Sequence, residues 1–200
     1  PGVYVDNARG TLLAMDHLWQ LGHRSIVCVS DERTADGPVR AAVYEGFMRD
    51  HGAGERIRTY FTTQPDPEPS YRLGRELFGH FDRPNRPTAV FAASDTIAIG
   101  LIQAAYQLRI AVPERLSIVG FDDIDIASFT VPPLTTISQS GVEMGRIAVN
   151  LLLDMLHHAR CTLFPGRNAT DSSAVLSSVG ARWRAARRAA APRGRPPGPP

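Results

Sequence analysis

The chain has 200 residues, of which 43% are hydrophobic, and its 22 basic and 20 acidic side chains give a formal net charge of +2. This length can bury a core as one large domain or two smaller lobes. All of the basic residues counted are Arg, so mechanisms that need a P-loop lysine, a Schiff-base lysine or a lysine general base are excluded.

The cysteine content and hydropathy indicate the compartment. Two cysteines, Cys28 and Cys161, are too few for a disulfide framework and fit a reducing cytoplasm. No apolar run approaches the roughly 20 residues of a membrane span. We therefore expect a cytoplasmic protein without a membrane partner.

Strand and helix signals alternate along residues 1–159, which predicts a parallel sheet covered by helices. In chain order we expect a strand at 3–5, a helix ending at 21, strand 25–29, helix 39–50, strand 57–61, helix 70–81, strand 88–92, helix 96–108, strand 116–121, strand 135–138 and helix 141–158. One face of the last helix carries Met144, Ile147, Leu151 and Met155, as in a docked helix.

Residues 160–200 differ from the rest in composition. They are rich in Pro, Gly and Ala, and they hold eight Arg against one acidic residue. Such a segment has few apolar anchors and is typical of a disordered tail. A basic arm that binds nucleic acid is the alternative.

The stretch "SIVGFDDIDIAS" ends an apolar strand with Asp122, Asp123 and Asp125. Crowded carboxylates raise one another's pKa unless cations, hydroxyls or N–H groups receive them. In doubly wound sheets, ligands bind at the carboxyl ends of strands, where Asp6, Asn7, Ser94 and Asp95 also fall. We predict a rim of acceptors for a polar ligand. Side chains alternate along a strand, so Asp122 and Asp123 should point apart.

Four separate blocks carry a family resemblance: "VDNARGTLLAMDHLWQLGHRSI", "RPTAVFAASDTIAIG", "VPERLSIVGFDDIDIAS" and "PPLTTISQSGVEMGRIAVNLLLDML". In order and spacing, they resemble the LacI/GalR family of bacterial transcriptional repressors over about residues 3–156. The resemblance implies an α/β fold of the periplasmic-binding-protein-like type I, in which two lobes close on a small-molecule effector. It also implies a homodimer that binds operator DNA through a helix-turn-helix headpiece.

The same resemblance implies how the chain divides. Residues 1–159 would form the effector domain, with a largely complete C-terminal lobe at about 8–133. Residues 1–7 and 134–159 would be parts of an incomplete N-terminal lobe, and the headpiece would be absent from this chain.

Effector contacts are carried over from the family by position. Asp122 of "GFDD" matches the effector-binding carboxylate, Ser94 matches a polar contact, and Gln139 matches a polar position at the lobe crossover. The family's usual Arg is replaced by Val43, and Arg40, on the same helical face, is the nearest substitute.

Three of these contacts remain open at this stage. The aromatic that stacks on the effector is replaced by the "QPDPEP" run, so Phe61 or Tyr71 would have to serve. Ser94 and Asp95 could instead only cap a helix, and Arg40 could be a surface residue.

Enzymatic interpretations fit the sequence poorly. Asp123 and Asp125 resemble the Asp-x-Asp opening of haloacid-dehalogenase-like phosphatases, but Ala127 stands where that family has Thr, and the chain has no lysine. Adjacent strand aspartates do not provide the facing carboxylates of a glycosidase. No metal-ligand spacing occurs among the histidines. We therefore expect no enzyme activity, no cofactor and no metal.

The closer alternative is an extracytoplasmic sugar-binding protein of a transporter, which would use the same two-lobe architecture. The blocks "GHRSI", "VPERLSIVGFDD" and "PPLTTI" are more typical of regulators. We expect the ligand-sensing domain of a LacI-type regulator whose effector is a small polar molecule such as a sugar.

Overall fold

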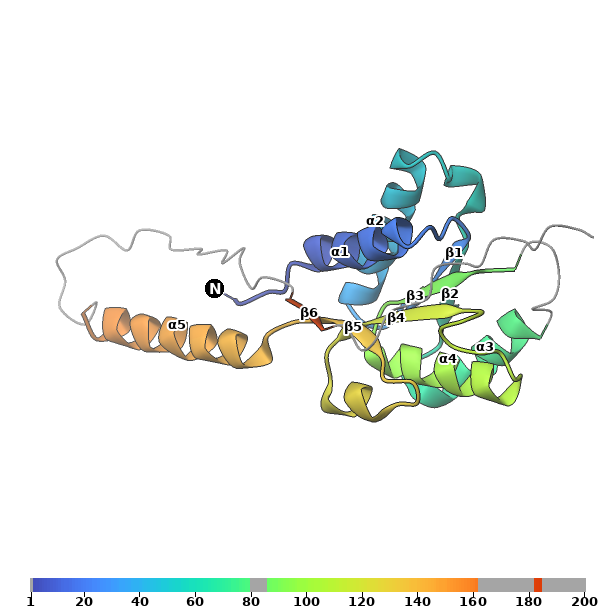
Figure 1. The fold of residues 1–200 in the computed structure, drawn as a ribbon. Helices are drawn as coiled ribbons and strands as arrows, with labels where there is room; N and C mark the ends of the chain where they lie inside the picture. Colours follow the sequence, from blue (N-terminus) through green and yellow to red (C-terminus); the bar gives the residue numbers. More distant parts are fainter. Residues whose placement is uncertain (1, 80–85, 162–181, 185–200) are drawn as a thin grey trace, which may run out of the picture. The chain divides into compact units, whose positions relative to one another are not determined.

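The computed structural model describes residues 2–79, 86–161 and 182–184 (Figure 1). The chain divides into two compact units. The larger contains Asn7–Ser138 and Trp183–Pro200, and the smaller contains Pro1–Asp6 and Gln139–Arg182.

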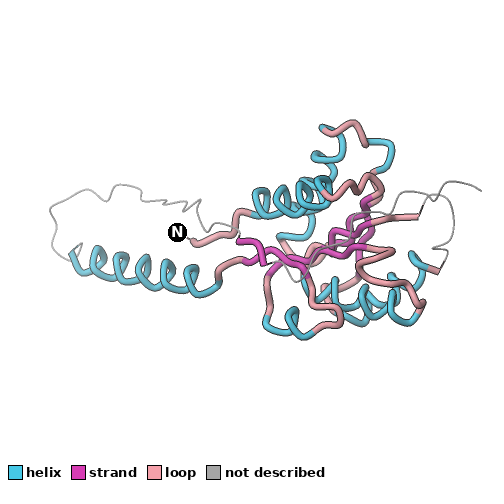
Figure 2. Tube along the Cα trace, in the orientation of Figure 1, coloured by secondary structure: helices cyan, strands magenta, loops and turns pink. Residues whose placement is uncertain are grey.

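The larger unit is built on a sheet with the strand order β2-β1-β3-β4-β5-β6. All pairings among the first five strands are parallel, which confirms the predicted sheet. Figure 2 shows these strands in magenta between helices. The bounds are β1 Ile26–Asp31, β2 Thr59–Thr62, β3 Ala89–Ala92, β4 Ser117–Asp122, β5 Thr135–Ser138 and β6 Arg182–Arg184.

Helices cover both faces of this sheet, as the doubly wound prediction requires (Figure 1). On one face, α1 (Asn7–Gln20) packs beside α2 (Asp36–Asp50), and on the other α3 (Pro67–Phe78) packs beside α4 (Asp95–Gln107). Two short 3₁₀ turns, η1 (Gly54–Arg56) and η2 (Asp125–Phe129), lie in the connections.

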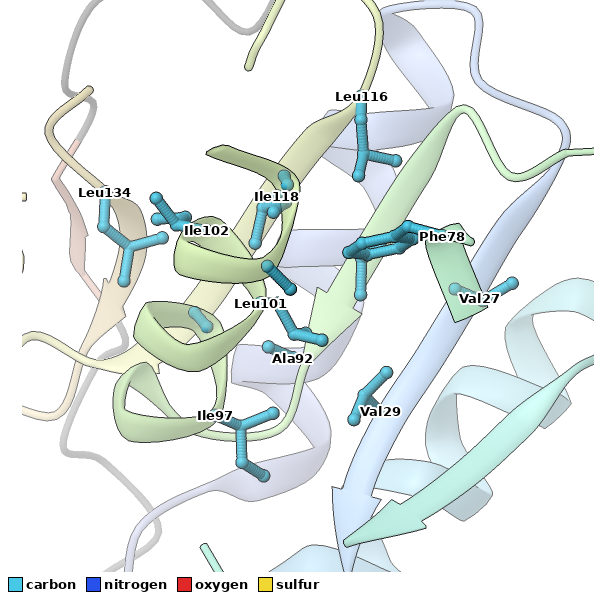
Figure 3. Packing of buried hydrophobic residues seen from close by; sticks show 14 of the residues in the cluster. Val27, Val29, Phe78, Ala92, Ile97, Leu101, Ile102, Leu116, Ile118 and Leu134 are labelled. Carbon is cyan, nitrogen blue, oxygen red and sulfur yellow. The ribbon is translucent and has the colours of Figure 1, made fainter. Parts of the chain in front are cut away.

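Double coverage explains the apolar strands. Every residue of β1 and β3 is buried, since a parallel sheet between two helical layers exposes neither face. Figure 3 shows the core between the sheet and the helices α3 and α4, where Val29, Ala92 and Leu101 lie close to one another. This core fixes α4, and therefore the residues at its N-terminus, against the ends of β3 and β4.

Several boundaries differ from the sequence-based expectation, since α2 begins at Asp36 and β2 spans Thr59–Thr62, and two further differences have a physical reason. Residues 3–5 are not a strand, because no described strand pairs with them and a strand requires a hydrogen-bonded neighbour. The helix expected at 70–81 begins earlier, at Pro67, because proline is favoured in the first turn, where its missing N–H costs nothing. The last residues of that predicted helix, 80 and 81, lie outside the described residues.

The smaller unit contains α5 (Gly141–Cys161). Met144, Leu151 and Met155 line a hollow of about 440 Å³ together with Gly2 and Val3. The expected docked face is therefore only partly covered: Met144, Ile147 and Leu151 are half-buried, whereas Met155 is exposed.

No helix in the described ranges is long and apolar enough to cross a membrane. The predicted tail, 160–200, lies outside the described residues except for the end of α5 and the three residues of β6.

We predict opposite effects for two helical Gly→Ala substitutions. A Cβ at Gly100 of α4 would lie 2.8 Å from Ser70 Cβ and from the backbone nitrogen of Tyr71, so Gly100→Ala should destabilise the fold by about 1–3 kcal/mol. A Cβ at Gly46 of α2 meets nothing within 4 Å, so Gly46→Ala should stabilise it by about 0.5–1 kcal/mol. Urea unfolding followed by circular dichroism measures both, and equal effects would contradict the close packing of α3 on α4.

Candidate functional site

The centre of the candidate site is Arg40, a buried arginine on α2 with only 4% of its side chain exposed. Its Nη1 donates to the carbonyl oxygen of Ala93, which follows β3, and to Asp122 Oδ1 at 3.1 Å, at the end of β4. Its Nε donates to Asn7 Oδ1 at 2.8 Å, at the start of α1. We call Arg40, Asp122, Asn7, Ala93 and Phe121 the Arg40–Asp122 cluster.

The pairing of Arg40 follows from its burial. A charge removed from water is tolerated only when it is paired and hydrogen-bonded, and the planar guanidinium offers five donors in a fixed arrangement. Its remaining surroundings are also favourable: its Cζ lies 3.7 Å from the ring centroid of Phe121, and Nη2 lies 3.6 Å from Asp36 Oδ2. Arg40 is therefore not the surface residue that the sequence left open as an alternative, and its effector contact stays a prediction.

The start of α2 is held close to β1, which aims Arg40 at the strand ends. Asp31, the last residue of β1, accepts from the backbone N–H groups of Arg33 and Thr34 at 3.0 and 2.7 Å. A Cβ at Gly37 would collide with the carbonyl oxygen of Asp31, so only glycine permits this approach. Arg40 follows one turn later on the helix.

Asp122 lies at a sharp turn. Asp122 and Asp123 both have positive φ, 123° and 58°, a region that non-glycine residues rarely adopt and in which Asp is better tolerated than most. The simple alternation expected for a continuing strand ends here. The Asp122 side chain is 27% exposed and keeps one oxygen on Arg40.

Asp95 lies behind this turn and is fully buried. It accepts from the Ile124 backbone N–H at 3.0 Å and from the Thr136 hydroxyl of β5. Burial raises the pKa of Asp95 to about 6, the negative charge of Asp122 adds to the rise, and hydrogen bonds from Thr136, Ile124 and Asp123 oppose it. The sequence left Asp95 open between a helix cap and a ligand contact, and it did not indicate this carboxylate as a partner of the turn after β4.

Ser94 is the N-cap of α4, and its hydroxyl accepts from the Ile97 backbone N–H at 3.3 Å. The capping interpretation is therefore confirmed. The effector contact stays a prediction, although Ser94 directly follows Ala93, whose carbonyl oxygen meets Arg40.

The two aromatic candidates lie elsewhere. Phe61 is exposed on β2, the edge strand, with β1 and β3 between it and β4. Tyr71 is on α3, which covers the sheet face opposite α2 (Figure 1), and its hydroxyl donates to Gln107 Oε1 at 2.8 Å. Neither ring is brought to the Arg40–Asp122 cluster.

Three further residues for which the sequence provided an expectation are not members of the Arg40–Asp122 cluster. Asp6 and Gln139 belong to the smaller unit, and their effector roles stay predictions. Asp125 is exposed in η2, as expected of a solvated carboxylate. In the part of the chain that the structure describes, no group of three or more His, Cys, Asp or Glu is placed to hold a metal ion.

Two contributors were missed as site residues. Asn7 was noted only as a polar residue near a strand end, although its amide orients the guanidinium 33 residues away. Phe121 was seen only as a strand residue. The signal for Asn7 was its place before an apolar helical stripe, which marks a helix start.

Comparison with known proteins agrees with the fold described above. Residues 15–179 match the family described as "Periplasmic binding protein-like domain". The repressor CytR of Escherichia coli K12 is 36% identical over 158 residues, which are 78% of this chain and 45% of the relative. The ribose operon repressor of the same strain is 36% identical over 146 residues, 70% of this chain and 42% of the relative. The chain thus spans less than half the length of these relatives.

A solved structure extends the match. The LacI family transcriptional regulator from Enterococcus faecium with bound ribose superposes with a TM-score of 0.75 at 28% identity, over 94% of this chain and 65% of that one. The parallel sheet with helices on both faces, the family match and these relatives agree. The chain therefore belongs to the LacI/GalR family of transcriptional regulators, within the periplasmic-binding-protein-like domain of that family.

Proposed function

We propose that this chain is the ligand-sensing domain of a LacI-type transcriptional regulator and that it binds a small polar effector at the Arg40–Asp122 cluster. One observation carries the proposal: a partly exposed carboxylate, Asp122, stands at the carboxyl end of a parallel strand and is oriented by a buried arginine. Ligands of open α/β sheets bind at these strand ends.

The chemistry of this cluster suits a polyhydroxylated ligand. A carboxylate can accept about four hydrogen bonds, and Arg40 supplies one of them to Oδ1. Hydroxyl groups of a sugar are donors for such an acceptor, and charge-assisted bonds of this kind are the stronger ones. The related regulator from Enterococcus faecium holds ribose, which makes D-ribose the first compound to test.

In this proposal the effector acts by differential affinity. A ligand that contacts two lobes favours the lobe arrangement it binds better and shifts the population toward it. Operator DNA would be bound by a helix-turn-helix headpiece outside these 200 residues, in a cytoplasmic protein. The relatives named above are repressors, which favours a regulator over an extracytoplasmic sugar-binding protein or an enzyme.

We predict that Asp122→Asn weakens effector binding about tenfold or more, since it removes the charge and one acceptor while keeping the shape. Asp125→Asn is the matched control, because Asp125 is exposed in η2 and should leave affinity unchanged. Isothermal titration calorimetry of the full chain with D-ribose, other monosaccharides and nucleosides measures both. Loss of binding in Asp125→Asn with normal binding in Asp122→Asn would show that the wrong carboxylate was assigned.

We propose further that the regulator is a homodimer and that the outer surface of α3 and α4 is its contact surface. Tyr106 is 74% exposed and Val131 is 85% exposed, and they border a hollow of about 820 Å³. A large exposed apolar area marks an interaction site. Glu68 is the single charged residue in its lining, which consists of Pro67, Glu68, Tyr71, Ile99, Gly100, Ile102, Gln103, Tyr106, Gln107, Thr130 and Val131.

We predict that Tyr106→Lys shifts the chain from dimer to monomer, raising the dissociation constant about tenfold or more, because it places a charge on the apolar contact. A cation near the C-terminus of α4 is compatible with the helix. Leu152→Lys, on the exposed side of α5, is the matched control. Sedimentation velocity measures both, and dissociation by Leu152→Lys alone would place the contact on α5 instead.

A further inference from the structure

We infer that Asp95 is a positioning residue for effector binding: its carboxylate holds the turn at residues 122–124 by the backbone, so that the Asp122 side chain stays against Arg40. The consequence for effector binding rests on the proposed function, because both concern the same site. Its physical content, the restraint on the turn, is independent of which effector binds.

The position of Asp95 is unusual for a carboxylate. It is the first residue of α4 and is fully buried. One oxygen accepts from the Ile124 N–H at 3.0 Å, the other from the Thr136 hydroxyl, and the Asp123 backbone also hydrogen-bonds to this carboxylate. Asp95 thereby connects α4, β5 and the turn after β4.

Gly120 shows that the strand is built around this carboxylate. A Cβ on Gly120 would collide with Asp95 Oδ1 and would lie 3.3 Å from its Cγ. Any other residue at position 120 would therefore displace the carboxylate from the end of β4. The Asp95 carboxylate therefore lies against the backbone of Gly120 on one side and accepts from hydrogen-bond donors on the other.

The turn needs such a restraint because its backbone is strained. Asp122 and Asp123 are consecutive non-glycine residues with positive φ, and such conformations persist only where the surroundings impose them. The backbone N–H groups of the residues that follow Asp122 donate to the Asp95 carboxylate, and these hydrogen bonds supply the constraint. Without it, the backbone would relax toward negative φ, and the Asp122 carboxylate would leave Arg40.

The charges that face Asp95 define a spectroscopic signature. The negative charge of Asp122, which is itself paired with Arg40, acts on Asp95. The other groups that face Asp95 are the uncharged hydroxyl of Thr136 from β5 and the backbone of Asp123 from the turn. With its pKa near 6, Asp95 is mostly ionised at neutral pH and takes up a proton as the pH falls through 6. The Ile124 amide, which donates to it, should report this proton directly.

The experiment compares Asp95→Asn and Asp95→Ala with a control, Thr136→Val, in the full chain. Asparagine can still accept from Ile124 through its oxygen and donate to the Thr136 hydroxyl through its amide, so it should rescue what alanine loses. Thr136→Val removes one bond to the same carboxylate without touching the bonds to the turn. If Asp95 had a purely structural role, Asp95→Ala and Thr136→Val would have similar effects.

The first readout needs no ligand. In nuclear magnetic resonance spectra, we expect the Ile124 amide to titrate near pH 6 in the wild-type chain and to lose this titration in Asp95→Asn. Amide exchange at Ile124 should speed up about tenfold or more in Asp95→Ala and stay within about threefold of wild type in Asp95→Asn and Thr136→Val. An Ile124 amide that neither titrates nor changes its exchange rate would overturn the inference.

The second readout is affinity for D-ribose. We expect it to fall about tenfold or more in Asp95→Ala and to be retained within about threefold in Asp95→Asn and Thr136→Val. Equal weakening in Asp95→Ala and Thr136→Val would overturn the positioning role. Absence of D-ribose binding to the wild-type chain would count against D-ribose as effector, and the ligand-free readout would still decide the role of Asp95.

Discussion

A guanidinium that is removed from water must find its hydrogen-bond acceptors inside the protein, and this requirement organises the carboxyl-terminal edge of the sheet. Arg40 meets it with acceptors from three separate places: Asn7 at the start of α1, Ala93 after β3 and Asp122 at the end of β4. Leaving such a charge unpaired would cost several kcal/mol. The pairing therefore fixes α2 relative to α1 and to two strand ends.

The turn that carries Asp122 is restrained from two sides. Arg40 binds its side chain from the α2 face, and Asp95 binds the backbone that follows it from the N-terminus of α4. Each restraint uses a buried polar group whose partners come from different elements. A turn held in this way is preorganised, so a ligand bound at Asp122, as proposed, would not have to supply the ordering of its carboxylate.

The fold could be predicted from local signals because strand and helix signals alternate along the chain. The short apolar runs of β1 and β3, which are buried throughout, are typical of strands in a parallel sheet. Residues 3–5 were wrongly expected to be a strand, since apolar composition does not provide a pairing partner. Arg40 and Asp122 were predicted as site residues from the family resemblance, Asp122 by its motif position and Arg40 by helical spacing from the position of the family's Arg, and the structure brings the two together. The contact from Asn7 joins residues 33 apart, and no local periodicity encodes it. Local patterns also do not show which face of the sheet a helix covers. Tyr71 was therefore considered for the site, although α3 covers the face opposite α2.

The arrangement of the site depends most on the coupling between Arg40 and Asp122, which a double-mutant cycle measures directly. Arg40→Met keeps an apolar stem over Phe121, Asp122→Asn keeps the shape of the carboxylate, and the double variant removes both charges. From urea unfolding of the four proteins, we predict a coupling free energy of at least about 1 kcal/mol, as expected of residues in one buried network. Additive effects of the two substitutions, with a coupling near zero, would contradict the claim that this pair holds the site together.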